Sequence, residues 1–129
     1  MRSAFYRINM TIEPDTFVDL STTRGPMRTH LFIPTGVGRY PAVIFYSEIY
    51  QMTGPIRRMA AELAGNGFLV AVPEVYHEFE ELGTVLAYDA EGTERGNELK
   101  FTKEIASFDE DSAVLSEYLV KHPRCTGKV

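Results

Sequence analysis

Glu48 stands at a position where its carboxylate could take part in chemistry. It follows the apolar run of residues 42–46, and beyond it a segment with helical periodicity leads to a second apolar run at residues 68–72. Apolar runs without alternation are typical of strands that are covered on both faces, so this order predicts a β-α-β unit. Because such units place ligands beyond the carboxyl ends of their strands, Glu48 is the first candidate functional residue.

Other residues with reactive or metal-binding side chains form no complete motif. The three histidines are widely spaced, at His30, His77 and His122, and the pair His77-Glu78 lacks the second histidine of a helical zinc site. Cys125 is not expected to be a nucleophile, because a proline stands where the first glycine of a nucleophile elbow would be. We therefore expect no metal site, and we interpret His77 as a surface histidine in preference to a catalytic one.

Composition narrows the function classes. The chain has 129 residues, 44% of them apolar, which suits one domain, and its net charge of -5 provides no general attraction to nucleic acid or anionic lipid. The glycines within residues 36–38 precede a strand and lack the rest of a dinucleotide-binding loop, so no cofactor is expected. A single cysteine, no apolar run typical of a signal peptide and no apolar segment of about 20 residues predict a cytoplasmic protein that does not enter membranes.

The segment between the two apolar runs has the signals of a complete helix. Thr53 can cap its start, and Pro55 suits an early helical position. The sequence Gly65-Asn66-Gly67 ends it, because these residues tolerate positive φ. Apolar residues recur at helical spacing and should form the buried face: Ile56, Met59, Ala60, Leu63 and Ala64.

Further elements are predicted on either side of the β-α-β unit. Two short runs at residues 17–20 and 27–33 flank Arg24-Gly25-Pro26, which predicts an antiparallel hairpin. Ser107-Phe108-Asp109-Glu110 is a capping-box pattern that predicts the start of a helix, and His122-Pro123 stops this helix. Because residues 125–129 have the pattern of a turn and the first step of another strand, we expect the chain to be the amino-terminal part of a larger domain.

An acidic region with weaker periodicity, residues 75–107, separates the second apolar run from the last helix. A long excursion from the carboxyl end of a central strand commonly covers or borders a ligand pocket, and the scattered apolar residues could support a short helix. A solvated loop is an equally acceptable interpretation, because runs of charge are often simply exposed. The acidic residues are Glu78, Glu80, Glu81, Asp89, Glu91, Glu94 and Glu98.

The stretch YPAVIFYSEIYQMTGPIRRMAAELAGNGFLVAVPEVY resembles the amino-terminal half of the dienelactone hydrolase family of α/β-hydrolases. In that family a strand ends in a Glu-Ile pair, here Glu48-Ile49, and after the helix the next strand ends in a Pro-acidic-x-Tyr turn, here Pro73-Glu74-Val75-Tyr76. The resemblance continues to Gly127-Lys128-Val129. It implies an α/β fold with a mainly parallel central sheet flanked by helices, an antiparallel lead-in hairpin, and one domain of which residues 1–129 form the amino-terminal portion.

The resemblance also implies site residues. The Ile49 backbone N–H would donate to an oxyanion, and Glu48 would lie beside the nucleophile and help to set its protonation state. The nucleophile, a cysteine or a serine on a G-x-[CS]-x-G elbow, is expected downstream of this chain together with the aspartate and histidine of the triad. The residues implied at the substrate are Tyr50, Tyr76, His77 and Glu78.

One departure from the family pattern bears on the substrate. Members that act on the dienelactone carry an arginine shortly after the Pro-acidic-x-Tyr turn to hold the substrate carboxylate, whereas this sequence has His77 and Glu78. An acidic residue at that place would repel a carboxylate. We therefore expect an uncharged or differently held ester or lactone.

The sequence thus predicts a hydrolase of a carboxylic ester or lactone, with a small molecule as its partner. The 129-residue chain alone is expected to be inactive, because the triad is not within it. The alternative is a non-catalytic α/β binding or scaffold module in which the acidic region contacts a partner. A flavodoxin-like receiver domain is disfavoured, because the acidic cluster that follows its first strand is missing.

Overall fold

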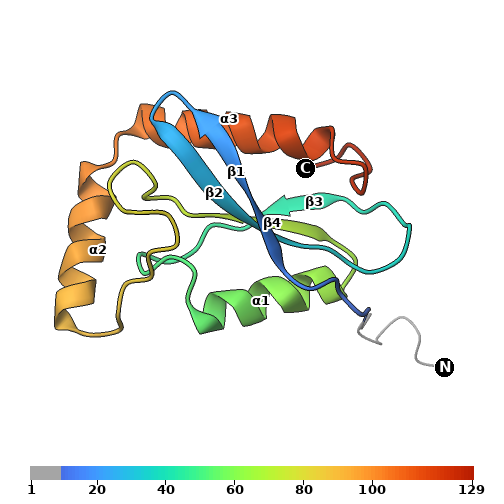
Figure 1. The fold of residues 1–129 in the computed structure, drawn as a ribbon, viewed down its shortest axis with the longest axis horizontal. Helices are drawn as coiled ribbons and strands as arrows, with labels where there is room; N and C mark the ends of the chain where they lie inside the picture. Colours follow the sequence, from blue (N-terminus) through green and yellow to red (C-terminus); the bar gives the residue numbers. More distant parts are fainter. Residues whose placement is uncertain (1–9) are drawn as a thin grey trace.

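The computed structural model describes residues 10–129, so the prediction about the amino terminus falls outside the described residues. The first apolar run forms a strand that is shorter than predicted, and the region after residue 75 contains a full helix. In chain order the elements are β1 (Thr16–Thr22), β2 (Gly25–Phe32), β3 (Ala42–Ile44), α1 (Gly54–Gly65), β4 (Leu69–Pro73), α2 (Ala90–Thr102) and α3 (Ile105–Val120) (Figure 1).

The four strands form one sheet in the order β1-β2-β4-β3. β2 pairs antiparallel with both β1 and β4, whereas β3 and β4 are parallel and are connected through α1. The predicted hairpin and the predicted β-α-β unit are both confirmed. The carboxyl ends of β3 and β4 therefore lie at the same edge of the sheet.

The hairpin turn lies slightly earlier than predicted. Thr22 pairs with Gly25, so Thr23 and Arg24 form the turn, and Gly25 takes a φ of 109° that glycine adopts without a steric penalty. Pro26 belongs to β2 but lies outside the part of β2 that pairs with β4. Its missing N–H therefore removes no hydrogen bond from the centre of the sheet.

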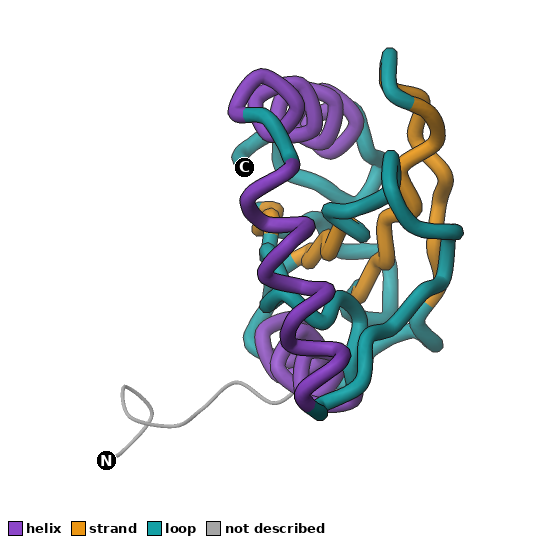
Figure 2. The backbone as a smooth tube through the Cα atoms, turned by 90° about the vertical axis from the view of Figure 1, so that its left-hand side faces the viewer, coloured by secondary structure: helices purple, strands orange, loops and turns teal. Residues whose placement is uncertain are grey.

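Both faces of β4 are covered, which explains its unbroken apolar sequence. Val70 and Val72 pack in one cluster with Ile56 of α1, whereas Leu69 and Ala71 pack in another cluster on the opposite face. Leu119 of α3 belongs to the second cluster. Figure 2 shows the resulting layers, with α1 and α3 on opposite sides of the strands.

Helix α1 begins and ends where the sequence predicted. The Thr53 hydroxyl accepts a hydrogen bond from the Ile56 N–H, and Gly67 has a φ of 95° just after the helix. The prediction was wrong for Met59, which is 52% exposed. The buried row consists of Ile56, Ala60 and Ala64, and Met59 lies beside this row at the edge of the apolar stripe.

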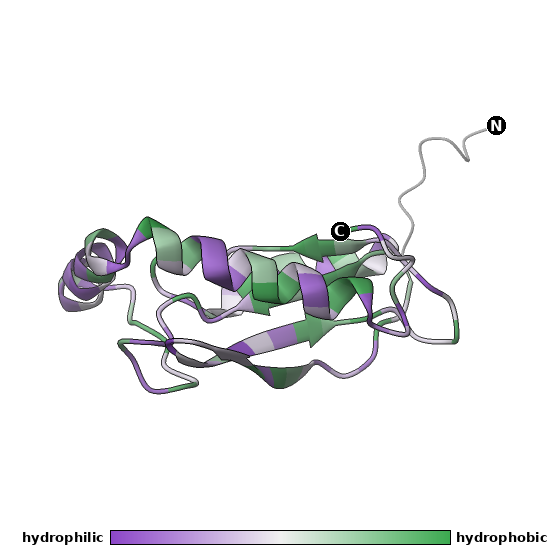
Figure 3. Cartoon of the chain, turned by 90° about the horizontal axis from the view of Figure 1, so that it is seen from above, coloured by the Kyte–Doolittle hydropathy of each residue, from purple (hydrophilic) through white to green (hydrophobic). Residues whose placement is uncertain are grey.

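Helix α3 begins earlier than the capping-box pattern predicted. Its N-cap is Glu104, which makes no side-chain capping bond, and Ser107 already lies inside the helix. Ser107 instead donates to Glu78, and the Glu110 carboxylate accepts from the backbone and hydroxyl of Thr23 at the hairpin turn. Contacts with distant segments thus replace the local cap. Seen from above, α3 lies over the strands and presents both hydrophilic and hydrophobic residues (Figure 3).

Helix α2 stands at the end of the sheet where β3 and β4 finish (Figure 1). The Asp89 carboxylate caps it by accepting from the Gly92 N–H at 2.7 Å. The acidic region is therefore largely ordered, and the helix that its apolar residues could support is present. Among residues 10–129, no helix combines the length and the apolar character that a bilayer crossing requires.

The last residues run beside the outer edge of β3. Tyr40 and Cys125 form a parallel bridge, and the Ala42 N–H donates to the Lys128 carbonyl at 2.8 Å. The sequence pattern of residues 125–129 predicted a turn and the first step of another strand, and the structure has an isolated parallel bridge and this hydrogen bond at that place. Cys125 is buried beside Ala42, at the amino end of β3 and away from Glu48.

Candidate active site

A cleft opens where β3 and β4 end. Its volume is about 380 Å³, which is in the range of small-molecule sites, about 300–1,000 Å³. Its lining comes from the segments that follow the two strands and from the two later helices: Tyr46, Ser47, Glu48, Ile49, Val75, Tyr76, Lys100, Phe108 and Ser112. Glu48 and Ile49 therefore lie together at this edge of the sheet, and both border the cleft.

The Glu48 carboxylate is on the open side of the cleft. The residue is exposed, and within residues 10–129 its carboxylate makes no ion pair or hydrogen bond. Ser47 donates its hydroxyl to the Glu48 carbonyl at 3.0 Å and so contacts only the backbone. A carboxylate that makes no hydrogen bond or ion pair within the chain can accept a hydrogen bond from a ligand or from a neighbouring catalytic group.

Residues 48–51 form a tight turn that carries the Ile49 amide. The Gln51 N–H donates to the Glu48 carbonyl at 3.2 Å, which leaves Ile49 and Tyr50 as the two central residues. No residue that the structure describes accepts a hydrogen bond from the Ile49 N–H. The amide is therefore available to donate to an oxygen that acquires negative charge during a reaction.

Two residues that support this turn were missed by sequence reasoning. Gln51 is 1% exposed and has a φ of 68°, a conformation that costs a non-glycine residue on the order of 1 kcal/mol. Gly96 of α2 packs directly on the turn, since a Cβ there would lie 2.9 Å from the Ile49 carbonyl oxygen. A loop glutamine and a helical glycine give no functional signal in a single sequence.

A hydrogen bond also joins two of the segments that line the cleft. The Tyr46 hydroxyl lies 2.5 Å from the Ser112 hydroxyl and so connects the segment after β3 to α3. Burial raises the pKa of the Tyr76 phenol, which keeps this side chain neutral over the usual range of pH. The cleft therefore offers apolar and hydroxyl surface beside one carboxylate and the Lys100 ammonium.

Comparison with known proteins decides the family. The sequence profile described as the dienelactone hydrolase family matches residues 27–128. This chain belongs to the dienelactone hydrolase family. Among curated relatives, a Saccharomyces cerevisiae protein provisionally named a carboxymethylenebutenolidase is 40% identical over 120 residues, which are 88% of this chain and 43% of that protein. A Synechocystis protein with the same provisional name is 31% identical over 96 residues, which are 70% of this chain and 37% of that protein.

Solved structures share the fold. A crystal structure from Klebsiella pneumoniae, provisionally titled a dienelactone hydrolase, has a TM-score of 0.73 at 20% identity and covers 91% of this chain and 47% of that one. A dienelactone hydrolase-like promiscuous phosphotriesterase from metagenomic libraries has a TM-score of 0.66 at 16% identity, with 88% and 45% covered. The chain thus spans less than half the length of these relatives, and it has their α/β-hydrolase fold.

Of the residues that the dienelactone hydrolase resemblance implies at the substrate, Tyr76 borders the cleft and Tyr50 does not. The Tyr50 hydroxyl lies 2.8 Å from the hydroxyl of Thr93 on α2, and its ring packs edge-on against Tyr88 with centroids 4.6 Å apart. Tyr50 thus anchors the turn to α2. Tyr50 is not among the residues that line the cleft.

The interpretation of His77 as a surface histidine was wrong. Its side chain is 0% exposed, and its Nε2 lies 3.0 Å from Oδ1 of Asp111 on α3. Its Nδ1 has no hydrogen-bond partner within the described residues. Because Asp111 is distant in sequence, nothing around His77 could indicate that α3 would cover it.

Glu78 also lies in a buried ionic cluster and does not border the cleft. Its Oε1 is 2.5 Å from the Lys103 ammonium, and its Oε2 accepts from Ser107 at 2.6 Å. The same ammonium lies 2.8 Å from Asp111 Oδ2. The charge of Glu78 is therefore compensated inside the protein, and the repulsion that we expected between Glu78 and a substrate carboxylate does not follow from this geometry.

This ionic cluster, formed by His77, Glu78, Lys103 and Asp111, has three metal-ligating groups close together. One ligand atom each from His77, Glu78 and Asp111 lie within 4.8 Å of one another. The Lys103 ammonium contacts both carboxylates, so it supplies the positive charge that these carboxylates need. A divalent ion would have to displace this ammonium, and the cluster is better described as a buried salt-bridge network.

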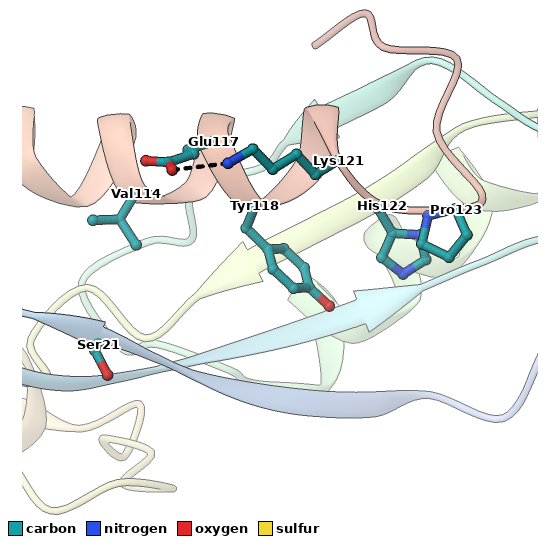
Figure 4. Close-up of a pocket in the computed structure, with 7 residues that line it drawn as sticks. All are labelled: Ser21, Val114, Glu117, Tyr118, Lys121, His122 and Pro123. Atoms are coloured by element: carbon teal, nitrogen blue, oxygen red, sulfur yellow. Dashed lines mark hydrogen bonds and ion pairs between the residues drawn. The ribbon is translucent and has the colours of Figure 1, made fainter.

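A second hollow lies between β1 and the carboxyl-terminal half of α3 (Figure 4). It has a volume of about 480 Å³, and Tyr118 and His122 point into it. Burial and the Arg124 charge lower the pKa of His122, and the Arg124 N–H donates to His122 Nδ1 at 3.0 Å. None of the turn residues 48–51 borders this hollow, so it is separate from the candidate active site.

Proposed function

We propose that the protein to which this chain contributes hydrolyses a carboxylic ester or lactone in the cleft beyond β3 and β4. The observation that carries the proposal is that, within the described residues, Glu48 with its unpaired carboxylate and Ile49 with its free N–H border the same cleft. Family membership and the provisional names of the curated relatives support the same reaction class.

The nucleophile in this proposal is a serine or cysteine beyond Val129. The bond between the Ala42 N–H and the Lys128 carbonyl supports it, because a strand that continued in parallel from Lys128 would end beside the segment after β3. The nucleophile attacks the acyl carbon, and the resulting oxyanion accepts from the Ile49 N–H. Loss of one such donor costs about 3 kcal/mol of transition-state stabilisation. The alcohol then leaves, and water hydrolyses the acyl-enzyme.

Glu48 helps to set the protonation state of the nucleophile in this mechanism. Its carboxylate accepts a hydrogen bond from the thiol or hydroxyl and can take up the proton as the nucleophile ionises. Tyr76, Val75 and Phe108 form the wall against which the substrate would pack. Tyr50, His77 and Glu78 act indirectly, because each is hydrogen-bonded to a residue of α2 or α3.

The setting that we propose is the cytoplasm, with a small-molecule substrate and no nucleic-acid or membrane partner. The single cysteine and the net charge of -5 support this setting. An oxyanion hole at Ile49 and the cytoplasmic location are parts of the same proposal.

The test is Glu48→Gln in the complete protein, assayed with an activated aryl ester. We expect kcat to fall about 100-fold, which is a typical contribution for a group that acts on proton positions, while the melting temperature is unchanged. Glu117→Gln is the matched control, because Glu117 is 71% exposed on α3, pairs with Lys121 of the same helix and does not border the cleft. Unchanged turnover in Glu48→Gln would remove Glu48 from the mechanism, and a complete protein without ester hydrolysis would contradict the proposed function.

A further inference from the structure

Gln51 has an unusual backbone conformation at the end of the turn. Its φ is 68°, and it is the one non-glycine residue with positive φ in the part of the chain that the structure describes. Asparagine and aspartate enter this region more readily than glutamine, and glycine does so without steric conflict. The presence of a long amide side chain here calls for a compensating contact.

The Gln51 side chain makes two hydrogen bonds that can compensate for the backbone strain. Its Nε2 donates to the Thr84 carbonyl at 3.0 Å, and its Oε1 accepts from the Tyr76 N–H at 3.2 Å. Both partners are backbone groups of the segment that follows β4, and the glutamine is 1% exposed. One buried amide therefore joins the turn after β3 to two places in the segment after β4, one near its start and one further along the loop.

The backbone of Gln51 completes the connection. Its N–H closes the turn on the Glu48 carbonyl at 3.2 Å, and its own carbonyl accepts from Thr53, the N-cap of α1, at 2.9 Å. Gln51 thus fixes the turn relative to α1 and to the opposite wall of the cleft, where Tyr76 lies. Both connections act on the turn that contains the Ile49 N–H.

We propose that Gln51 is a positioning residue of the hydrolase, whose side-chain amide aims the Ile49 N–H at the oxygen of the scissile carbonyl. This inference rests on the proposed function, since it assigns the way in which the Ile49 amide is held for catalysis. Gln51 touches no reacting atom, because its amide is buried behind the turn. Its effect is on the geometry of the turn alone.

Two substitutions in the complete protein separate this role from a merely structural one. Gln51→Gly keeps the positive φ without steric cost and removes both side-chain bonds, so the protein should still fold, with a melting temperature that falls because the Tyr76 N–H and the Thr84 carbonyl lose their partner. We expect kcat on an aryl ester to fall about 10- to 100-fold, with KM within about twofold, because small displacements of a catalytic donor have effects of this size. Asn66→Gly is the control, since it removes a side-chain amide bond to the Glu62 carbonyl at the far end of α1.

Gln51→Glu adds a reversible test. The ionised carboxylate can accept from the Tyr76 N–H but cannot donate to the Thr84 carbonyl, whereas the protonated carboxyl can do both. The kcat of this variant relative to the unchanged protein should therefore rise as the pH falls from about 8 to about 5, since a buried carboxyl gains its proton in this direction.

The outcomes are distinct. Wild-type kcat in Gln51→Gly, or a Gln51→Glu ratio that does not change with pH, would overturn this inference and leave the proposed function in place. Failure of the complete protein itself to hydrolyse any aryl ester would overturn the proposed function and this inference with it. A loss of kcat in Gln51→Gly together with acid rescue in Gln51→Glu is the expected result.

Discussion

At the residue scale, the ionic cluster and its neighbour Ser107 join two walls of the cleft. His77 and Glu78 directly follow Tyr76, and Ser107 and Asp111 stand next to Phe108 and Ser112. The bonds within the cluster therefore hold the segment after β4 against α3, directly behind the cleft. Removing one member of a buried ion network leaves the other charges without compensation, which is far more costly than losing a surface pair.

Lys103→Met tests this role of the cluster. It removes the ammonium that contacts both Glu78 and Asp111 and leaves Glu78 with the more distant Arg24 guanidinium, 3.9 Å away, so we expect the free energy of unfolding to fall by about 3–5 kcal/mol in a denaturant titration. Lys121→Met is the control, because the Lys121 side chain is 73% exposed in its pair with Glu117, and its effect should be below about 1 kcal/mol. Equal stability of the two variants would show that the cluster does not hold the walls together.

At the element scale, the hairpin, the β-α-β unit and α1 were predictable because their signals are local. The unbroken apolar run of β4 indicated two covered faces, and Thr53 and Gly67 marked the ends of α1. The start of α3 was not predictable in this way. Ser107 and Glu110 bond to Glu78 and to the hairpin turn instead of forming a local cap, and these partners are remote in sequence.

Helix α2 packs on the turn that carries the Ile49 amide. Gly96→Ala places a methyl group 2.9 Å from the Ile49 carbonyl oxygen, so the turn or the helix must move. Alanine is the better helix former by about 1 kcal/mol, yet we expect kcat of the complete protein on an aryl ester to fall about tenfold or more, because the donor is displaced. Glu94→Ala, at an exposed position of the same helix, is the control for helix propensity.

A retained kcat in Gly96→Ala would show that the turn tolerates a shift of α2. In that case the contact between Gly96 and Ile49 would be a packing feature without consequence for the amide. A loss of kcat accompanied by an equal loss in Glu94→Ala would assign the effect to the helix and not to the contact.

At the scale of the whole molecule, the sheet brings together residues that the sequence keeps apart. Glu48 and Ile49 could be placed from the sequence, because a β-α-β unit specifies which edge of the sheet carries them. The roles of Gln51, Gly96 and the ionic cluster could not be predicted, because they come from contacts between segments that are distant in sequence and adjacent only in the folded chain. The residues that could be predicted border the cleft, whereas those that could not be predicted contact the turn or the segments around the cleft.

In the proposed active site, the Ile49 N–H and the Glu48 carboxylate face the acyl group of an ester or lactone. The most direct measurement is a crystal structure of the complete protein with an aryl trifluoromethyl ketone, to which a serine or cysteine adds and forms a tetrahedral adduct with a negatively charged oxygen. We predict that this oxygen lies about 2.7–3.1 Å from the Ile49 nitrogen, beside Glu48. An adduct oxygen that contacts other donors would show that the Ile49 N–H is not the oxyanion donor. An adduct outside this cleft would show that the active site lies elsewhere.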